Sequence, residues 1–447
     1  MRGLITRGKT VTCAISLLLI SFLSFGQTMP AQVSKNQTFT TNYYDYEALG
    51  VNPANLSANR REGKKVSFGL MQTNFLLFNK TLKTDLIHGG GLDRLTDPGH
   101  WFDDILVERT YVGMENTLLG LNFNTKKAGS FALSVKTLVL AEVELNGAFE
   151  DLEFEGTSFS NLPEIIMTTI TENPDNLPPG ETSIMRMSVV NEFSTAYSRR
   201  IVNTGKVQLY GGVGVKYLMG FADVGIQFNN HQVAGYYSLS SILPDGFGGD
   251  STSADLQQAK KFSHGFGTSI GTSLRFQKLR AGISVVDIGF IKWPVKDIFV
   301  TKEDVVGEVL TEDEINDAIN NAITDFQRNG DGKEWLPAKL TFGASYDVHK
   351  YVSFYLDVIA PLNDSPRNMT RPMVGIGTWL SLKHIVTLRT GANLIDKKLV
   401  AIPMWFSLFG GKKKTFEFSL GTSDFLAFFL PGREYMQAET AMMKFHF

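Results

Sequence analysis

Hydrophobic and polar residues alternate with a period of two along several long stretches of the chain. In Lys206–Met219, apolar residues take every second position, and lysine, glutamine or glycine fill most of the positions between them. The same alternation runs through Ser130–Leu145 and Lys261–Phe276. Alternation sustained over about ten residues is typical of a transmembrane β-strand, which presents one face to lipid and the other to a lumen. We therefore expect Val213 to face lipid and Gly212 to face the lumen.

A soluble β-sandwich also alternates, and the length of the runs separates the two architectures. Sandwich strands are usually about five or six residues long, whereas these runs are roughly two to three times as long. Their polar face consists mostly of Gly and Ser with scattered charges. The pattern predicts an all-β fold, a transmembrane antiparallel β-barrel spanning residues 64–447.

The lengths of the connections give an independent indication of the strand number. From Lys64 onward, long or medium connections alternate with short ones, and this scheme gives about fourteen strands. An even number is required of a barrel whose two termini lie on the same side of the membrane. The short connections, which we place in the periplasm, are residues 125–129, 202–205, 277–278, 349–350, 383–384 and 410–414.

The amino terminus has the order of a secretion signal. Three basic residues precede a short apolar run that ends near Gly26, and such a run is too short to span a bilayer as a helix. We predict a signal peptide over residues 1–26. The only cysteine, Cys13, lies inside it, so the exported chain would contain no disulfide and no cysteine site. The formal charge of −2 argues against nucleic-acid binding.

Between the signal and the first strand, residues 27–63 show neither a helical nor a strand period. The stretch Asn42–Arg60, NYYDYEALGVNPANLSANR, is rich in Tyr, Asn and turn-forming residues. A barrel of about fourteen strands leaves a lumen unless something fills it, and irregular backbone is tolerated at membrane depth inside protein or water. We expect residues 27–63 to form a luminal plug; a loose periplasmic tail is the alternative.

Two motifs carry a resemblance to known families. The sequence GVNPANLS, with Asn52, Pro53 and Ala54, resembles the Asn-Pro-Ala motif of the long-chain fatty-acid transporter (FadL-type) barrels, and the overall design is similar to the PorV-type barrels of the type IX secretion system. The last strand, TAMMKFHF, places Phe445 and Phe447 on its lipid face and resembles the signal that the barrel-assembly machinery reads. The resemblance implies an outer-membrane barrel family of unknown function whose amino-terminal segment folds inward.

Other motifs indicate little chemistry. GTSIG, Gly267–Gly271, matches the nucleophile elbow, but a strand surrounds Ser269 and no helix follows it. One amphipathic helix is expected over residues 311–326, in an outer loop, where it packs on the barrel mouth or docks a partner. The following NGDGKE lacks the acidic first and twelfth positions of a calcium loop, and the histidines show no ligand spacing. We predict no enzyme activity, no metal and no cofactor.

These features predict a protein of the outer membrane of a Gram-negative bacterium. We expect it to mediate passage of hydrophobic or amphipathic small molecules, with membrane lipid and the barrel-assembly machinery as its partners. The alternative is a non-enzymatic component of a secretion or surface-assembly system that engages other proteins.

Overall fold

The computed structural model describes the chain in fourteen stretches. They are residues 40–58, 64–79, 110–125, 127–144, 182–229, 232–239, 262–293, 296–301, 332–363, 372–382, 385–395, 399–411, 415–430 and 435–447. The signal region, the helix expected over 311–326 and the first half of the NGDGKE turn lie outside the described residues.

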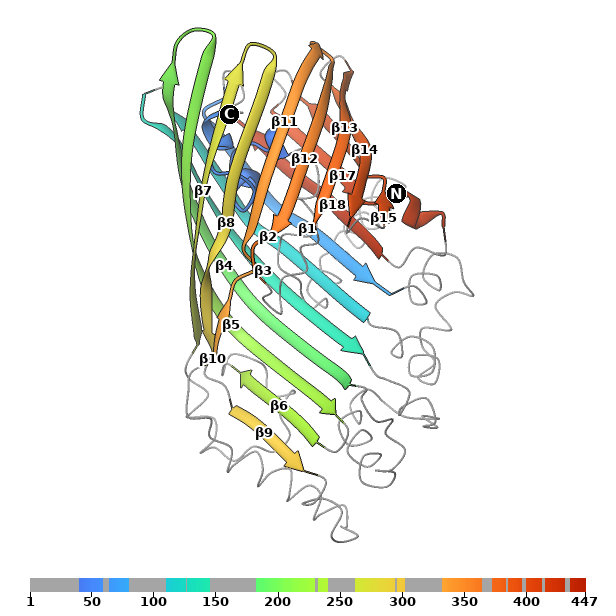
Figure 1. Cartoon of the computed structure of the whole chain (residues 1–447). Coiled ribbons are helices and arrows are strands. Elements are labelled where there is room, and N and C mark those ends of the chain that lie inside the picture. Colours follow the sequence, from blue (N-terminus) through green and yellow to red (C-terminus); the bar gives the residue numbers. More distant parts are fainter. Residues whose placement is uncertain are drawn as a thin grey trace, which may run out of the picture.

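A closed antiparallel β-barrel makes up most of the described chain (Figure 1). Fourteen of its eighteen described strands form a ring in which each pairs with the next, and β18 closes the ring by pairing with β1. The ring strands are β1 (Val66–Phe78), β2 (Thr110–Thr125), β3 (Gly129–Glu144), β4 (Thr182–Asn203), β5 (Val207–Asn229), β7 (Ser263–Phe276), β8 (Leu279–Trp293), β11 (Lys339–His349), β12 (Val352–Pro361), β13 (Met373–Leu382), β14 (Val386–Ile395), β16 (Met404–Gly410), β17 (Phe416–Thr422) and β18 (Tyr435–His446). The barrel and its strand number, predicted from alternation and connection length, are confirmed.

Four further strands extend the sheet, three of them within residues 221–260 and 295–335, which the spacing of the alternating runs predicted to be long connections. β6 (Gln232–Leu239) pairs with the far part of β5, and β9 (Lys296–Thr301) pairs with β6. β10 (Gly332–Trp335) pairs with the end of β8, and β15 (Leu399–Ala401) with the end of β14. The expectation that residues 221–260 and 295–335 are connections throughout was therefore wrong. A strand that extends past the barrel can still offer backbone donors and acceptors to a neighbour.

The two faces of the barrel follow the predicted alternation. Val213 and Phe266 are 52% and 60% exposed on the outer face, and Met443 is exposed at the end of the chain. Lys444 and His446, which alternate with Met443, are buried on the inner face. Among the described residues, no helix is long and apolar enough to cross a membrane.

The strand ends that flank the six short connections lie at one end of the barrel, together with the start of β1 and the carboxyl terminus. We expect this end to face the periplasm.

Lys206→Cys, in an exposed short turn, should then resist an impermeant thiol reagent on intact cells, whereas Lys333→Cys, exposed on β10 at the opposite end, should react. Labelling of Lys206→Cys and not of Lys333→Cys would reverse the orientation.

Candidate functional site: the barrel lumen

Residues 40–58, which we call the luminal segment, lie inside the curve of the barrel at the short-turn end (Figure 1). The segment contains the 3-10 turns η1 (Thr40–Asn42) and η2 (Asp45–Ala48) and one helical turn, α2 (Asn55–Ala58). Tyr46, Ala48, Ala54 and Leu56 are almost fully buried. Short turns suit this sequence because Asn and Pro favour compact loop backbone.

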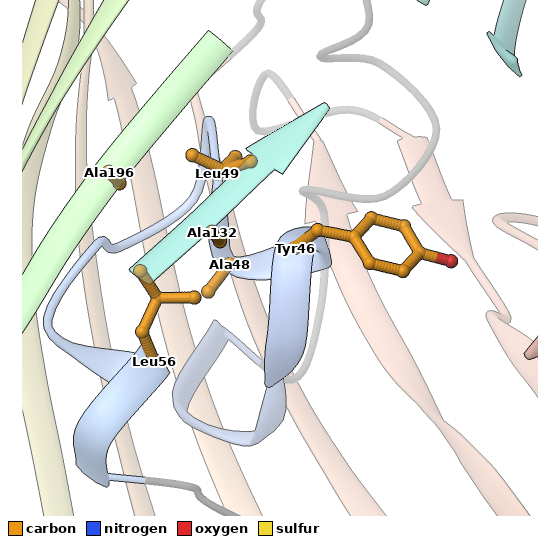
Figure 2. Close-up of a cluster of buried hydrophobic side chains, with 6 residues drawn as sticks. All are labelled: Tyr46, Ala48, Leu49, Leu56, Ala132 and Ala196. Carbon is orange, nitrogen blue, oxygen red and sulfur yellow. The ribbon is translucent and has the colours of Figure 1, made fainter. Parts of the chain in front are cut away.

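Glycines on the inner face of the barrel make room for the luminal segment. The ring of Tyr46 occupies the space that a Cβ would take at Gly69 on β1 and Gly120 on β2. Figure 2 shows Ala48, Leu49 and Leu56 gathered near Ala132 and Ala196 of the wall, with the Tyr46 ring pointing away from them. Close approach of this kind requires wall residues without bulky side chains.

The Asn-Pro-Ala motif lies against β5, β7 and β8. The side-chain amide of Asn52 donates to the carbonyl of Thr272 (3.0 Å), and its oxygen accepts from the backbone N–H of Ala54 (3.0 Å). A Cβ at Gly212 would collide with the peptide that joins Pro53 to Ala54, and one at Gly271 with the amide of Asn52. The three motif residues therefore meet the wall at positions that only glycine can occupy without a shift.

Charged residues of the luminal segment meet the last two strands. Glu47 forms an ion pair with Lys444, and the hydroxyl of Tyr44 donates to Glu417 Oε2 (2.6 Å). His446 lies between two carboxylates, with Nε2 3.1 Å from Glu417 Oε2 and Nδ1 3.5 Å from Asp45 Oδ2. These groups are buried, so each charge depends on a specific partner for its stability.

Hydrogen bonds tie the other side of the segment to the opposite wall. The backbone N–H of Thr40 donates to Asp357 Oδ1 on β12 (2.9 Å). Ser284 of β8 donates to the carbonyl of Val51 (2.5 Å), and Ser198 of β4 donates to the carbonyl of Ala54 (3.0 Å). Contacts with β4, β8, β12 and β18 show that the segment reaches widely separated parts of the wall.

Beyond the luminal segment, toward the long-connection end, the inner wall carries a layer of ion pairs. Lys216 of β5 lies 2.8 Å from Glu192 Oε2 of β4 and also pairs with Asp287 of β8. Lys136 of β3 lies 2.8 Å from Glu115 Oε1 of β2. These side chains are at least nine-tenths buried, and each pair joins different strands. The layer links β2 to β3 and β4 to β5, and the pair between Lys216 and Asp287 reaches across β7 to β8.

An apolar cluster follows the ion-pair layer on the same wall. Leu218 lies on β5 two positions beyond Lys216, and it is buried together with Val190, Ile291, Trp293 and Leu336. Trp293 is 2% exposed, and its indole N–H donates to Glu334 Oε2 (3.2 Å). A lumen that passes only water and ions has a polar lining, so passage of water and ions does not account for this apolar cluster.

The inner face of β14 carries polar atoms without hydrogen-bond partners among the described residues. They include Thr387 Oγ1, Arg389 Nε and both amide atoms of Asn393. Trp379 Nε1 of β13 also has no hydrogen-bond partner among the described residues. Trp379 and Trp405 are the cross-strand neighbours of Arg389 on either side. Buried donors of this kind are costly unless water or a ligand satisfies them.

The remaining motifs do not form a reactive centre. Ser269 lies in the middle of β7, where its hydroxyl oxygen accepts from the backbone N–H of Asp287 (3.3 Å), so the strand context expected for GTSIG is observed. His264 is exposed on the outer face. Within the described ranges, no group of three or more potential ligands is placed to hold a metal ion.

Phe445 and Phe447 lie where the ring closes. The Phe445 ring packs near Phe68 of β1 and Phe416 of β17, with ring centroids 6.4 and 5.7 Å away. The backbone of Phe447 exchanges hydrogen bonds with Val66. Both residues therefore contact the strands that β18 joins when the barrel closes.

Sequence reasoning missed the partners of the luminal segment on the wall. They are the inner-face glycines Gly69, Gly120, Gly212, Gly271, Gly282 and Gly343, which lie on six different strands. The available signal was the abundance of glycine on the polar face of the alternating runs, which we took only as a sign of a small polar lining.

Comparison with known proteins identifies a family. Residues 108–388, more than half of the chain, match the model of a family described as "Family of unknown function (DUF5723)". The chain belongs to this family. Its model spans the barrel from just before β2 into β14, and so includes the ion-pair layer but neither Arg389 nor the luminal segment.

No curated protein matches the sequence. Solved structures of similar form include the toluene transporter TodX of Pseudomonas putida, with a TM-score of 0.46 and 12% identity over 94% of this chain and 97% of that one. A FadL homologue of Pseudomonas aeruginosa gives a TM-score of 0.45 and 10% identity over 94% and 98% of the two chains.

Proposed function

We propose that this barrel mediates the passage of hydrophobic or amphipathic small molecules across the outer membrane of a Gram-negative bacterium. In this proposal, the luminal segment is a plug at the periplasmic end, with Asn52, Pro53 and Ala54 as its anchor on the wall. Phe445 and Phe447 act earlier, as the signal that brings the chain to the barrel-assembly machinery.

The apolar cluster on the inner wall carries the proposal. Val190, Leu218, Ile291 and Trp293 belong to strands whose inner faces are otherwise mostly small or polar. These side chains are at most 8% exposed and pack against one another, so they form an apolar surface to which a hydrophobic molecule can add. A hydrophobic molecule that enters from the long-connection end would meet this cluster before it meets the ion-pair layer.

The polar atoms of β13 and β14 that have no hydrogen-bond partner support passage of molecules that also have a polar end. Arg389 Nε and Trp379 Nε1 are two buried donors on paired residues, and Trp405 adds an aromatic surface next to them. An acceptor group on an amphipathic molecule could satisfy both donors while its apolar part contacts the indoles.

Binding of radiolabelled dodecane to the purified full-length protein tests the proposal. Trp293→Ala should weaken saturable binding by about tenfold or more, equivalent to about 1.4 kcal/mol, because it removes a large aromatic surface from the cluster. Trp335→Ala is the matched control. Trp335 lies on the neighbouring β10 but is 56% exposed on the outer face, so its removal should leave saturable binding unchanged.

Absence of saturable dodecane binding to the unmodified protein would contradict the proposal, as would equal binding by the two variants. The alternative role in a secretion or surface-assembly system would then remain, and it would require a stoichiometric protein partner in native membrane extracts.

A further inference from the structure

All six short turns of the barrel are basic. Cations lie at Lys126 and Lys127 in the first turn, Arg199, Arg200 and Lys206 around the second, Arg275, Lys278 and Arg280 around the third, Lys350 in the fourth, Lys383 in the fifth and Lys412, Lys413 and Lys414 in the sixth. None of the six short connections contains Asp or Glu, although Asp347, two residues before the fourth, pairs with Arg280 (2.8 Å). By contrast, the long connection over residues 145–181 contains several acids and no Lys, Arg or His. The two ends of the barrel therefore differ in charge.

Closure of the barrel brings the described cations of the first four turns to one end. The described members Lys127, Arg199, Arg200, Lys206, Lys278 and Lys350 are exposed at the end of the barrel that also holds the carboxyl terminus. Within the described part of the chain, none of these six side chains forms an ion pair; Lys278 donates to the carbonyl of Val348 (3.3 Å), and Lys350 lies over the ring of Tyr351. We call these six residues the basic rim.

Exposed apolar side chains border the basic rim on the outer face. Ile201 is 66% exposed beside Arg200, Leu382 is 64% exposed at the fifth turn, and Phe447 is 64% exposed at the chain end. The cations therefore begin where the lipid-facing surface ends, which is the depth of lipid headgroups. Lys and Arg at such positions extend their charged ends toward the interface while their stems contact apolar surface.

We propose that the basic rim binds the headgroups of anionic phospholipids in the adjoining leaflet. The distribution of the charge favours lipid over a protein partner, because the described cations occur at four successive turns, from β2–β3 to β11–β12, and so follow the barrel over more than half of its ring strands. The surrounding lipid contacts this whole arc. Attraction between basic residues and an anionic leaflet acts over about one Debye length, so headgroups next to the rim feel it most strongly.

Native mass spectrometry of the full chain in detergent, titrated with phosphatidylglycerol or phosphatidylcholine, tests this site. The unmodified protein should retain phosphatidylglycerol in preference to phosphatidylcholine. Replacing Arg199, Arg200 and Lys206 by Gln should weaken phosphatidylglycerol retention by about fivefold to tenfold. Lys292→Gln with Lys333→Gln, exposed cations at the opposite end, is the control and should retain phosphatidylglycerol as the unmodified protein does.

Two further measurements separate other sources of the signal. Inorganic phosphate at the same concentration as the lipid should not displace phosphatidylglycerol; complete displacement would show an anion site without lipid specificity and overturn the proposal. Equal retention of the two lipids, or unchanged retention by the triple variant, would also overturn it. A triple variant that keeps its lipid but loses a stoichiometric acidic protein from native membranes would assign the rim to a protein partner instead.

Discussion

Removing Tyr43–Ala58 should produce a folded barrel whose conductance in planar bilayers is several times that of the full-length protein. The strands pair through their own backbone groups, and the ring closes between β1 and β18 without help from the luminal segment. The segment, however, contacts walls as distant as β4, β12 and β18 and buries Tyr46 and Leu56 inside the lumen. Its loss opens a water-filled path at the short-turn end.

A milder change should act in the same direction. In Gly212→Ala the new methyl group would collide with the Pro53–Ala54 peptide, and backbone cannot rotate away as a side chain can. Gly214→Ala is the matched control, because its methyl group would meet Ala196 and Ser269 at ordinary distances of 3.5 and 3.6 Å. We expect Gly212→Ala to conduct more than the full-length protein but less than the deletion variant. Gly214→Ala should conduct as the full-length protein does.

Heat modifiability on gels verifies that each of these variants folds. A deletion variant that folds but conducts no better than the full-length protein would show that other residues fill the lumen. Raised conductance in Gly214→Ala equal to that of Gly212→Ala would show that any disturbance of β5 opens the barrel, which would remove the support for a specific contact with the motif.

Lys216→Met should lower the free energy of unfolding by about 3–5 kcal/mol. The substitution removes the one cation that contacts both Glu192 and Asp287, and these side chains are 6% and 1% exposed. Two buried carboxylates on nearby strands would then lose their partner while they still repel each other. The urea dependence of folding in lipid vesicles measures the difference.

Two comparisons show whether the loss comes from the unpaired charges. Combining Lys216→Met with Glu192→Gln and Asp287→Asn should recover most of the stability, because neither position 192 nor position 287 then holds a buried carboxylate without its cation. Lys278→Met, at an exposed turn position, should change stability little. A single Lys216→Met variant as stable as the unmodified protein would mean that water in the lumen already screens these charges.

The sequence by itself determined the barrel, its strand number and the direction in which each alternating side chain points. These properties are local or periodic. The two-residue repeat places Val213 outside and Gly212 inside whatever the rest of the chain does, and the lengths of the connections fix which strand ends lie together. The basic charges of the short turns were likewise visible in the sequence, although only the closed barrel brings the described ones together at one end.

The tertiary structure decided which residues meet across the lumen. Tyr44 and Glu417 are 373 positions apart, and their hydrogen bond depends on the register at which the ring closes. The same closure determines that Gly212 faces Pro53, that Lys216 lies between Glu192 and Asp287, and that β6 and β9 continue the sheet beyond the barrel. A local pattern predicts which face of the sheet a side chain occupies. Its partner on that face depends on the height and rotation of distant strands, which only the closed ring fixes.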